Sequence, residues 1–418
     1  MTITNHQIDH TVAALVEILS FTYPADAVLS RYFREHPKLG ARDRAFVAET
    51  VFAILRHKRL LEYAADSRAP RPLLLAYLAR IEGMNLRQLE PLLKAREKDW
   101  FGEMKGRSAK DLPLGVQAEL PDWLVDKLRA AMSEADILEL GRAMQQPAPL
   151  DVRVNTLLAT RDEALAQLVK DKFDAAPTPC SPIGIRLQGR PMLSKHSLFN
   201  EGKVEVQDEG SQLLGFLLAP TRHDMVADFC AGAGGKTLML GAMMNSQGRL
   251  YAFDISDKRL AKLKPRLARS GLSNVQPQLI ASERDARIKR LAGKIDRVLV
   301  DAPCSGLGTL RRNPDLKWRQ TAESVHELTA KQASILESAA TLVKKGGRLV
   351  YATCSILPEE NQAIVEAFLA DHPEFKLLDC AELLKKQRIA LDTGPYLQLS
   401  PARHATDGFF AAAMERNA

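Results

Sequence analysis

Two cysteines stand at positions where a protein chain can do chemistry. Cys304 lies in the turn Asp301-Ala-Pro-Cys-Ser-Gly306 after one apolar run, and Cys354 lies in Thr353-Cys-Ser355 after another. Neighbouring parallel strands lie about 4.8 Å apart, so we expect both thiols at one edge of a sheet. A single free cysteine is usually a small buried hydrophobic residue. Two cysteines at strand ends favour a reactive pair over a packing role, and the first of them stands three residues after an aspartate.

Paired thiols beside a carboxyl suit methylation at carbon 5 of a pyrimidine. That carbon is too weak a nucleophile to attack a sulfonium methyl until a thiolate adds to carbon 6 and makes the ring an enamine. After transfer the carbon-5 proton leaves and the thiolate is eliminated, so a second ionisable group close by helps release the product. A carboxyl placed like that of Asp301 can hydrogen-bond N3 and the exocyclic amine. A free thiol has a pKa near ~8.5, so the nucleophile needs activation by positive groups or a dipole.

The glycine-rich segment DFCAGAGGKT (228–237) is predicted to join a strand to a helix. Glycines there let a ligand approach the backbone, and the helix N-terminus offers amide hydrogens to an acidic group. A phosphate-binding loop needs a glycine where Cys230 stands, and a dinucleotide fingerprint needs one where Thr237 stands. Asp254 ends the next strand, where a carboxylate can accept both ribose hydroxyls. A ribose without pyrophosphate is what S-adenosylmethionine offers; the alternative is a tight turn with an incidental aspartate.

These motifs resemble those of the RsmB/NSUN family of RNA cytosine-5 methyltransferases, and the resemblance covers most of the chain. The matching segments are VQDEGSQ (206–212), DFCAGAGGKT (228–237), Asp254, DAPCSGLGTLRRNPDLKWR (301–319), TCSILPEEN (353–361) and DGFFAA (407–412). The resemblance implies an enzyme that uses S-adenosylmethionine to methylate C5 of a cytosine in RNA through a covalent bond between a cysteine and C6.

The resemblance also implies roles for single residues. Cys354 is implied as the nucleophile, Cys304 as the group that assists release, and Asp301 as a contact of both base and cofactor. The implied cofactor contacts are Cys230, Ala231, Gly232, Ala233, Gly234, Gly235, Lys236, Asp254, Asp285 and Asp301. The segment after the third strand lacks the Gly-Asp pair common in bacterial members. Asp285 is our prediction for that contact, with Glu283 as the alternative.

Three regions are predicted along the chain. Residues 1–140 show apolar residues at helical spacing, as over 12–21, 23–33 and 42–65, and predict an all-α domain. Residues 141–222 combine proline-rich loops with short strands and a helix, and predict a small α+β linker module. Residues 223–418 alternate short apolar runs with helices and end in candidate antiparallel edge strands. We therefore predict an α/β fold with a doubly wound, Rossmann-like class I methyltransferase domain.

RNA is the predicted partner. LGARDRAFVAETVFAILRHKRLL (39–61) resembles the NusB-like RNA-binding domain of the bacterial 16S ribosomal RNA enzymes of the family. Its basic residues could contact phosphates or form a solvated face. The arginines of 311–319 favour RNA, while Trp318 could contact RNA or anchor a surface loop. We expect 16S ribosomal RNA as the substrate; the alternatives are transfer RNA with the same chemistry and a non-catalytic RNA-binding ribosome-assembly factor.

The composition excludes several other classes of protein. The 418 residues carry a net charge of +7 and are 46% apolar, an ordinary globular composition without a run long enough to span a bilayer. The N-terminus lacks a secretory signal, so we expect a cytoplasmic protein, and we expect a monomer. Five cysteines without a C-x-x-C pair argue against disulfides and against a thiolate zinc site. His6 and His10 lack a third ligand, so we predict no metal.

Overall fold

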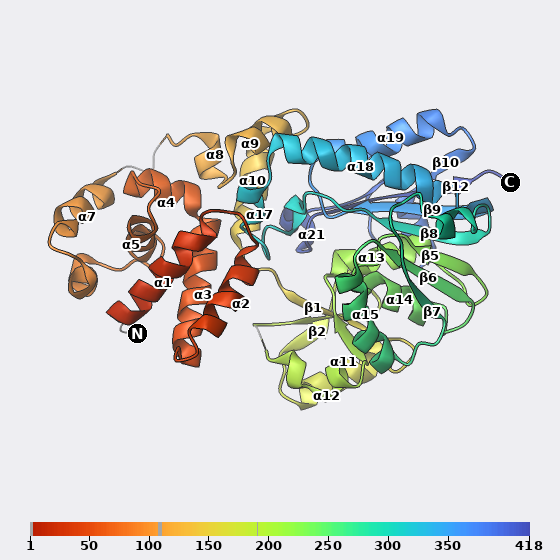
Figure 1. The fold of residues 1–418 in the computed structure, drawn as a ribbon, viewed down its shortest axis with the longest axis horizontal. Coiled ribbons are helices and arrows are strands. Elements are labelled where there is room, and N and C mark those ends of the chain that lie inside the picture. The colour runs from red at the N-terminus through yellow and green to blue at the C-terminus, as the bar shows by residue number, and fades with distance from the viewer. Residues whose placement is uncertain (1–2, 108–110, 190) are drawn as a thin grey trace. The chain divides into compact units, whose positions relative to one another are not determined.

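The computed structural model of the chain describes residues 3–107, 111–189 and 191–418 (Figure 1). It forms two compact units, Met1–Pro147 with Thr309–Ala322 and Ala148–Gly308 with Glu323–Ala418. The segment Thr309–Ala322 therefore departs from the predicted domain 223–418, and the helical unit extends beyond the predicted boundary at residue 140. Residues 1–2 and 108–110 of the predicted 1–140 domain, and residue 190 of the predicted module, lie outside the described residues.

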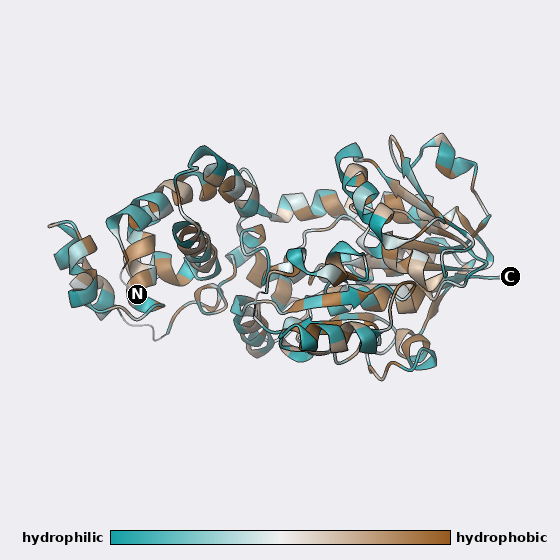
Figure 2. Ribbon diagram, turned by 90° about the horizontal axis from the view of Figure 1, so that it is seen from below, coloured by the Kyte–Doolittle hydropathy of each residue, from teal (hydrophilic) through white to brown (hydrophobic). Residues whose placement is uncertain are grey.

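In the described residues the first unit is built from helices and loops. Its elements are α1 (Asn5–Ile18), α2 (Ala25–Glu35), α3 (Ala41–Arg56), α4 (Lys58–Ala65), α5 (Pro70–Arg80), α6 (Leu86–Leu89), η1 (Glu90–Leu92), α7 (Glu97–Gly106), α8 (Leu114–Gln117), α9 (Asp122–Arg129), α10 (Glu134–Gln145) and α17 (Leu316–Arg319). Leu15, Val51, Ile54 and Leu73 are fully buried in its core. Figure 2 shows brown and teal alternating along these helices, as expected where each buries one stripe.

The predicted helix over 42–65 is broken at His57, between α3 and α4. Lys317 donates from Nζ to the carbonyl of Arg56 at 3.0 Å, at the end of α3. The carboxylate of Glu119 accepts two backbone N–H groups at the start of α4, at 2.9 and 3.1 Å. A cation at a helix C-terminus and a carboxylate at an N-terminus satisfy the polar groups that a break exposes. Because both side chains come from distant segments, local periodicity could not predict the break.

A small α+β part opens the second unit. Its antiparallel sheet has the order β2-β3-β1-β4. Its elements are β1 (Leu150–Val154), α11 (Arg161–Lys170), β2 (Ala175–Pro177), β3 (Gly184–Leu187), η2 (Leu193–Lys195), α12 (Ser197–Asn200) and β4 (Val204–Val206). Val152, Leu168 and Ile185 are fully buried in a core of its own. This sheet is separate from the one that carries the candidate site.

The large sheet has eight strands in the order β10-β12-β9-β8-β5-β6-β7, with β11 paired to β12. The strands are β5 (Met225–Asp228), β6 (Arg249–Asp254), β7 (Val275–Leu279), β8 (Ile295–Asp301), β9 (Val343–Thr353), β10 (Phe375–Leu378), β11 (Leu397–Leu399) and β12 (Phe409–Arg416). The central five strands, from β9 to β7, run parallel, and β12 runs antiparallel to β9. The strand order reverses at β5, and ligands of doubly wound sheets bind beyond the strand ends at that point.

Helices cover both faces of the large sheet (Figure 1). The helices of this part of the chain are α13 (Glu209–Leu218), α14 (Gly235–Met243), α15 (Asp257–Ser270), α16 (Ala286–Lys289), α18 (Ala322–Ala340), α19 (Gln362–Asp371), α20 (Cys380–Lys386) and α21 (Pro401–His404), with short turns η3 (Leu307–Thr309) and η4 (Pro358–Glu360). Val350 of β9 packs with Leu213 of α13, and its neighbour Tyr351 packs with Leu336 of α18 in a second core. Successive residues of a strand face opposite sides, so the two cores lie on opposite faces. The predicted doubly wound α/β fold is confirmed.

No helix within the described ranges is long and apolar enough to cross a membrane.

Candidate active site

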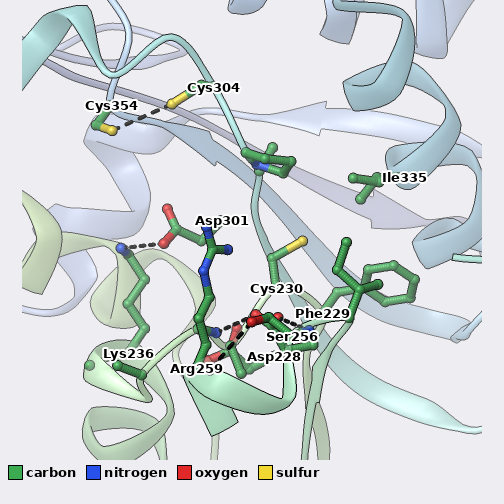
Figure 3. A pocket seen from close by; sticks show the side chains of 18 of the residues that line it. Asp228, Phe229, Cys230, Lys236, Ser256, Arg259, Asp301, Cys304, Ile335 and Cys354 are labelled. Carbon is green, nitrogen blue, oxygen red and sulfur yellow. Dashed lines mark hydrogen bonds and ion pairs between the residues drawn. The ribbon is translucent and has the colours of Figure 1, made fainter. Parts of the chain in front are cut away.

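The two predicted cysteines meet at the ends of adjacent strands. In the parallel pair β8 and β9, Asp301 lies opposite Ala352, so the turns that follow lie side by side. The sulfur atoms of Cys304 and Cys354 are 3.4 Å apart, although 50 residues separate them in sequence. Figure 3 shows the pair above the side chain of Asp301. The strand register therefore produces the contact that the two motifs predicted.

A cavity of about 1020 Å³ opens beside these thiols. The predicted site residues that line it are Cys230, Ala231, Gly232, Ala233, Gly235, Lys236, Asp254, Asp301, Cys304 and Cys354. They lie at the C-terminal ends of β5, β6, β8 and β9 or in the turns that follow, except that Gly235 and Lys236 begin α14. This is the edge of the sheet where the strand order reverses. The cavity therefore brings together nearly all of the residues that were predicted from separate motifs.

Gly234 is outside the cavity lining and has a structural role. It precedes α14 with a φ of +82°, a left-handed conformation that favours glycine. A Cβ atom at this position would lie 2.1 Å from Cδ1 of Leu263. Gly232 also has a left-handed φ of +56°, but a Cβ at Gly232 or at Gly235 would meet no atom within 4 Å, and both residues line the cavity. The turn thus needs one glycine for packing, while the other two leave space beside the backbone.

Lys236 and Asp301 form an ion pair inside the cavity, with 2.6 Å between Nζ and Oδ2 (Figure 3). Burial disfavours the charge of Lys236, but the carboxylate of Asp301 outweighs it and the pKa of Lys236 is raised. A negative charge on Cys354 would raise this pKa further. Lys236 is therefore close enough to act electrostatically on a thiolate at Cys354. The sequence predicted Lys236 only as a cofactor contact and gave no sign that its ammonium group lies near Cys354.

The environment differs between the cysteines. The pKa of Cys304 is raised well above its usual value, first by its hydrogen bond to Cys354 and then by burial. Burial, followed by the charges of nearby aspartates, also raises the pKa of Cys230. Burial raises the pKa of Cys380 to about 11. The proton of Cys304 is therefore hard to remove, and its sulfur lies in contact with that of Cys354.

Two carboxylates line the cavity beside the glycine-rich turn. Asp254, at the end of β6, accepts the backbone N–H groups of Gly232 at 2.8 Å and of Ser256 at 2.7 Å. Asp228, at the end of β5, has one buried oxygen without a hydrogen-bond partner in the described residues, and burial raises its pKa to about 7. Asp228 belongs to the glycine-rich motif, but its position there did not distinguish it from a strand residue.

The structure does not place Asp285 in the cavity lining. Asp285 precedes α16, and its carboxylate accepts the backbone N–H groups of Ala281 at 3.0 Å and Arg287 at 2.9 Å. These local bonds hold the carboxylate in the turn. The alternative residue, Glu283, does line the cavity, together with Ser282. Glu283 therefore lies closer to the cavity than Asp285 does, and the cofactor contact at Asp285 stays a prediction with Glu283 as the alternative.

Two predicted RNA-contacting side chains of the segment 311–319, those of Trp318 and Arg311, are largely buried or bonded. Trp318 donates from Nε1 to the carbonyl of Leu55 at 3.0 Å and packs against the helical core, which favours its anchoring role. Arg311 is buried, with 5% of its surface exposed. The preference for RNA contact by the arginines of this segment therefore does not hold for Arg311. The expectation came from composition alone, which does not show where a loop packs.

The cavity rim carries cations that no motif predicted. Arg259 and Lys262 of α15 and Lys331 of α18 are exposed and line the cavity. Their side chains make no ion pair with any residue that the structure describes. Within the same residues, no group of three or more His, Cys, Asp or Glu side chains is placed to hold a metal ion.

Three features define a Rossmann-like methyltransferase fold. They are the doubly wound sheet, the glycine-rich turn after β5 and the aspartate at the end of β6. Residues 215–415 match the model of a family described as 16S rRNA methyltransferase RsmB/F, and residues 120–192 match the ferredoxin-like domain of Methyltr_RsmF/B-like proteins. The chain belongs to this family, and the predicted resemblance is confirmed.

Relatives and solved structures agree with this placement. The chain is 32% identical to a probable ribosomal RNA small subunit methyltransferase B of Synechocystis sp., over 94% of this chain and 95% of the relative. It is 36% identical to a ribosomal RNA small subunit methyltransferase B of Sodalis glossinidius, over 70% of this chain and 65% of the relative. A crystal structure of a methyltransferase homolog from Pyrococcus horikoshii matches 71% of this chain and 99% of its own, with 28% identity and a TM-score of 0.58.

Proposed function

We propose that this protein methylates C5 of a cytosine in 16S ribosomal RNA, with S-adenosylmethionine as the methyl donor and Cys354 as a covalent nucleophile. The observation that carries the proposal is the contact between the sulfur atoms of Cys304 and Cys354, 3.4 Å apart beside a cavity with a glycine-rich wall. A protein that only binds RNA needs no thiol pair. The ribosomal substrate is supported by family membership and by the names of the relatives.

The residues around the turn fit S-adenosylmethionine. The open space at Gly232 and Gly235 would admit a nucleoside against the backbone. Asp254 uses its oxygens to hold the turn and keeps lone pairs for ribose hydroxyls. The unpartnered oxygen of Asp228 would accept a further polar hydrogen. When bound, S-adenosylmethionine would supply the methyl group of its sulfonium centre to C5, and its sulfur would be left as a thioether.

The chain's own residues would then act on the base in two stages. The thiolate of Cys354 forms a bond to C6, and the electron pair displaced from the C5–C6 double bond makes C5 nucleophilic. Asp301 would hydrogen-bond the ring edge, and Lys236 would hold Asp301 in place and lower the cost of a thiolate at Cys354. Both groups stand in the cavity before the base arrives, so they need little rearrangement.

Product release would break the covalent bond between Cys354 and C6. The C5 proton passes to water, its electron pair restores the C5–C6 double bond, and the C6–sulfur bond breaks with the electrons returning to Cys354. The S–H group of Cys304 would hydrogen-bond the departing thiolate, which is possible because its raised pKa keeps the proton on Cys304. The base must be unstacked for this attack, because its C6 face is covered within a duplex.

The exposed cations at the cavity rim support a polyanionic substrate. Arg259, Lys262 and Lys331 line the cavity and would contact phosphates that flank an unstacked base. Such contacts fix register without reading sequence, so they do not select the cytosine.

Transfer of labelled methyl from S-adenosylmethionine tests the proposal. Unmodified 16S ribosomal RNA and bulk transfer RNA are incubated in parallel with the wild type and with Cys354→Ala. We expect label in ribosomal RNA with the wild type alone. Label in transfer RNA alone would show that transfer RNA, not 16S ribosomal RNA, is the substrate. Turnover by Cys354→Ala equal to that of the wild type would show that Cys354 is not the nucleophile. Absence of label in both RNAs would favour a non-catalytic assembly factor.

A further inference from the structure

One buried carboxylate is hydrogen-bonded both to the residue after Cys304 and to the residue after Cys354. Glu360 is 0% exposed and lies in η4, six residues after Cys354. Its carboxylate accepts the hydroxyl of Ser305 at 2.5 Å and the hydroxyl of Ser355. It also accepts the backbone N–H of Ser305 at 2.8 Å. Ser305 follows Cys304 and Ser355 follows Cys354, so the two reactive turns share one acceptor.

Gln332 of α18 supports the same carboxylate and the same turn. Its Nε2 donates to Glu360 at 2.9 Å and to the carbonyl of Pro303 at 2.9 Å. Cys304 is therefore flanked on both sides by residues held through Gln332 and Glu360. Gln332 and Glu360 are both fully buried, so water does not compete for these bonds.

The turn that carries Cys354 has a second support. Asn361 donates to the carbonyl of Ser355 at 3.1 Å and accepts the hydroxyl of Thr353 at 2.5 Å. The residues on both sides of Cys354 are thus fixed from the segment that follows it. No bond in this network is made to either sulfur, so the network fixes the turns and leaves both thiols available to the cavity.

We propose that Glu360 is a positioning residue that holds the thiols of Cys304 and Cys354 at contact distance. The proposal rests on the proposed function, because the contact matters for the release of a covalent product. Strand pairing alone sets the Cα positions at about 4.8 Å spacing and leaves the direction of each turn free. The shared acceptor removes that freedom by drawing both following serines to one point, where their hydroxyl oxygens lie 3.2 Å apart.

Only a full carboxylate fits this position. Four donors converge on its two oxygens, which matches the acceptor capacity of an ionised carboxylate. The variant Glu360→Gln keeps the size but replaces one oxygen by an NH₂ group, which cannot accept from the serine donors. At least one donor is then left unmatched in the core, and the turns separate to relieve it.

The test compares Glu360→Gln with Glu366→Gln, an exposed glutamate of α19 that serves as the matched control. Ser355→Ala removes one bond of the network and is a milder second variant in case Glu360→Gln does not fold. The first readout is a thiol-proximity assay with diamide, which takes two electrons and two protons from Cys304 and Cys354 as their disulfide forms. Peptide mass spectrometry then measures the disulfide with time.

We expect Glu360→Gln to form the disulfide at least fivefold more slowly than wild type, Ser355→Ala to fall between them, and Glu366→Gln to match wild type. The second readout is steady-state methylation. We expect kcat to fall at least tenfold with the KM for S-adenosylmethionine unchanged, and a Cys354–RNA adduct to accumulate on denaturing gels.

An unchanged disulfide rate in folded Glu360→Gln would overturn the proposal, whatever the activity. A slower rate with unchanged kcat would also overturn it, because the contact would then serve no step. A proportional loss of kcat and cofactor affinity, without adduct, would assign Glu360 a structural role instead. If wild type methylates no RNA, the proposed function fails, while the disulfide rates still measure whether Glu360 holds the thiols together.

Discussion

Lys236, in the first turn of α14, places its ammonium nitrogen 2.6 Å from the carboxylate of Asp301, the last residue of β8. The pair joins the glycine-rich turn to the turn that carries Cys304. A charge on Cys354 acts on the same lysine. The glycine-rich side and the thiol side of the cavity are therefore linked by one cation.

This arrangement predicts which thiol reacts first. Iodoacetamide at pH 8 should label Cys354 several-fold faster than Cys304, because the raised pKa of Cys304 keeps it protonated and only thiolates are strong nucleophiles. Lys236→Met should slow the labelling of Cys354 by removing the cation. Peptide mass spectrometry of the folded protein measures both rates, with buried Cys380 as an unreactive control. Faster labelling of Cys304 would reverse the proposed roles.

Removal of Cys304 should stop the reaction after methyl transfer. In Cys304→Ala the departing thiolate of Cys354 loses its hydrogen-bond donor, so the adduct with RNA should persist. We expect a band of protein joined to RNA that survives denaturing gels and is absent from Cys304→Ala/Cys354→Ala. Normal turnover of Cys304→Ala without any adduct would exclude the role in release.

Asp254 should contribute to cofactor affinity through ribose hydroxyls and through the turn that it holds. Asp254→Ala leaves those donors unmatched, and we expect binding of S-adenosylmethionine to weaken by about 1–3 kcal/mol. This corresponds to roughly a 5- to 150-fold higher Kd in calorimetric titration. Asp257→Ala, an exposed aspartate on α15, is the control and should bind normally. Equal affinities of both variants would remove Asp254 from the cofactor site.

The break between α3 and α4 should make the first unit sensitive to acid. Burial, followed by the charges of Lys317 and Arg56, lowers the pKa of His57 from 6.5 to about 4. Between these values the unfolded chain binds more protons than the folded chain, so the free energy of unfolding falls as pH drops from about 6.5 toward 4. Because His57 is partly exposed, we expect a loss of roughly 1–2 kcal/mol relative to His57→Gln.

Tryptophan fluorescence in urea measures this effect directly. Trp100, Trp123 and Trp318 are the three tryptophans of the chain, and all lie in the first unit. Unfolding curves at pH 7 and pH 4.5 for wild type and His57→Gln isolate the histidine from other titrating groups of the unit. If the stability of the variant depends on pH as steeply as that of the wild type, the acid sensitivity has another source.

The sequence by itself determined the elements and the motifs of the site. Alternating apolar runs and helical spacing predicted the parallel sheet, because burial on two faces imposes that pattern. The glycine-rich segment 228–237 and the turns at Cys304 and Cys354 were recognisable because each motif is formed by consecutive residues. Asp254 followed from its place at a strand end, a position that chain order alone defines.

Only the tertiary structure decided which distant groups meet. It placed the segment Thr309–Ala322 with the N-terminal helices, broke a helix at His57 and kept Asp285 out of the cavity. It also joined Ser305 and Ser355 through Glu360, which reads in the sequence as an ordinary helix-start acid. Each case depends on a buried polar group finding a partner from another part of the chain. Local propensity and spacing hold no information about such partners, because the need for them arises only when packing removes water.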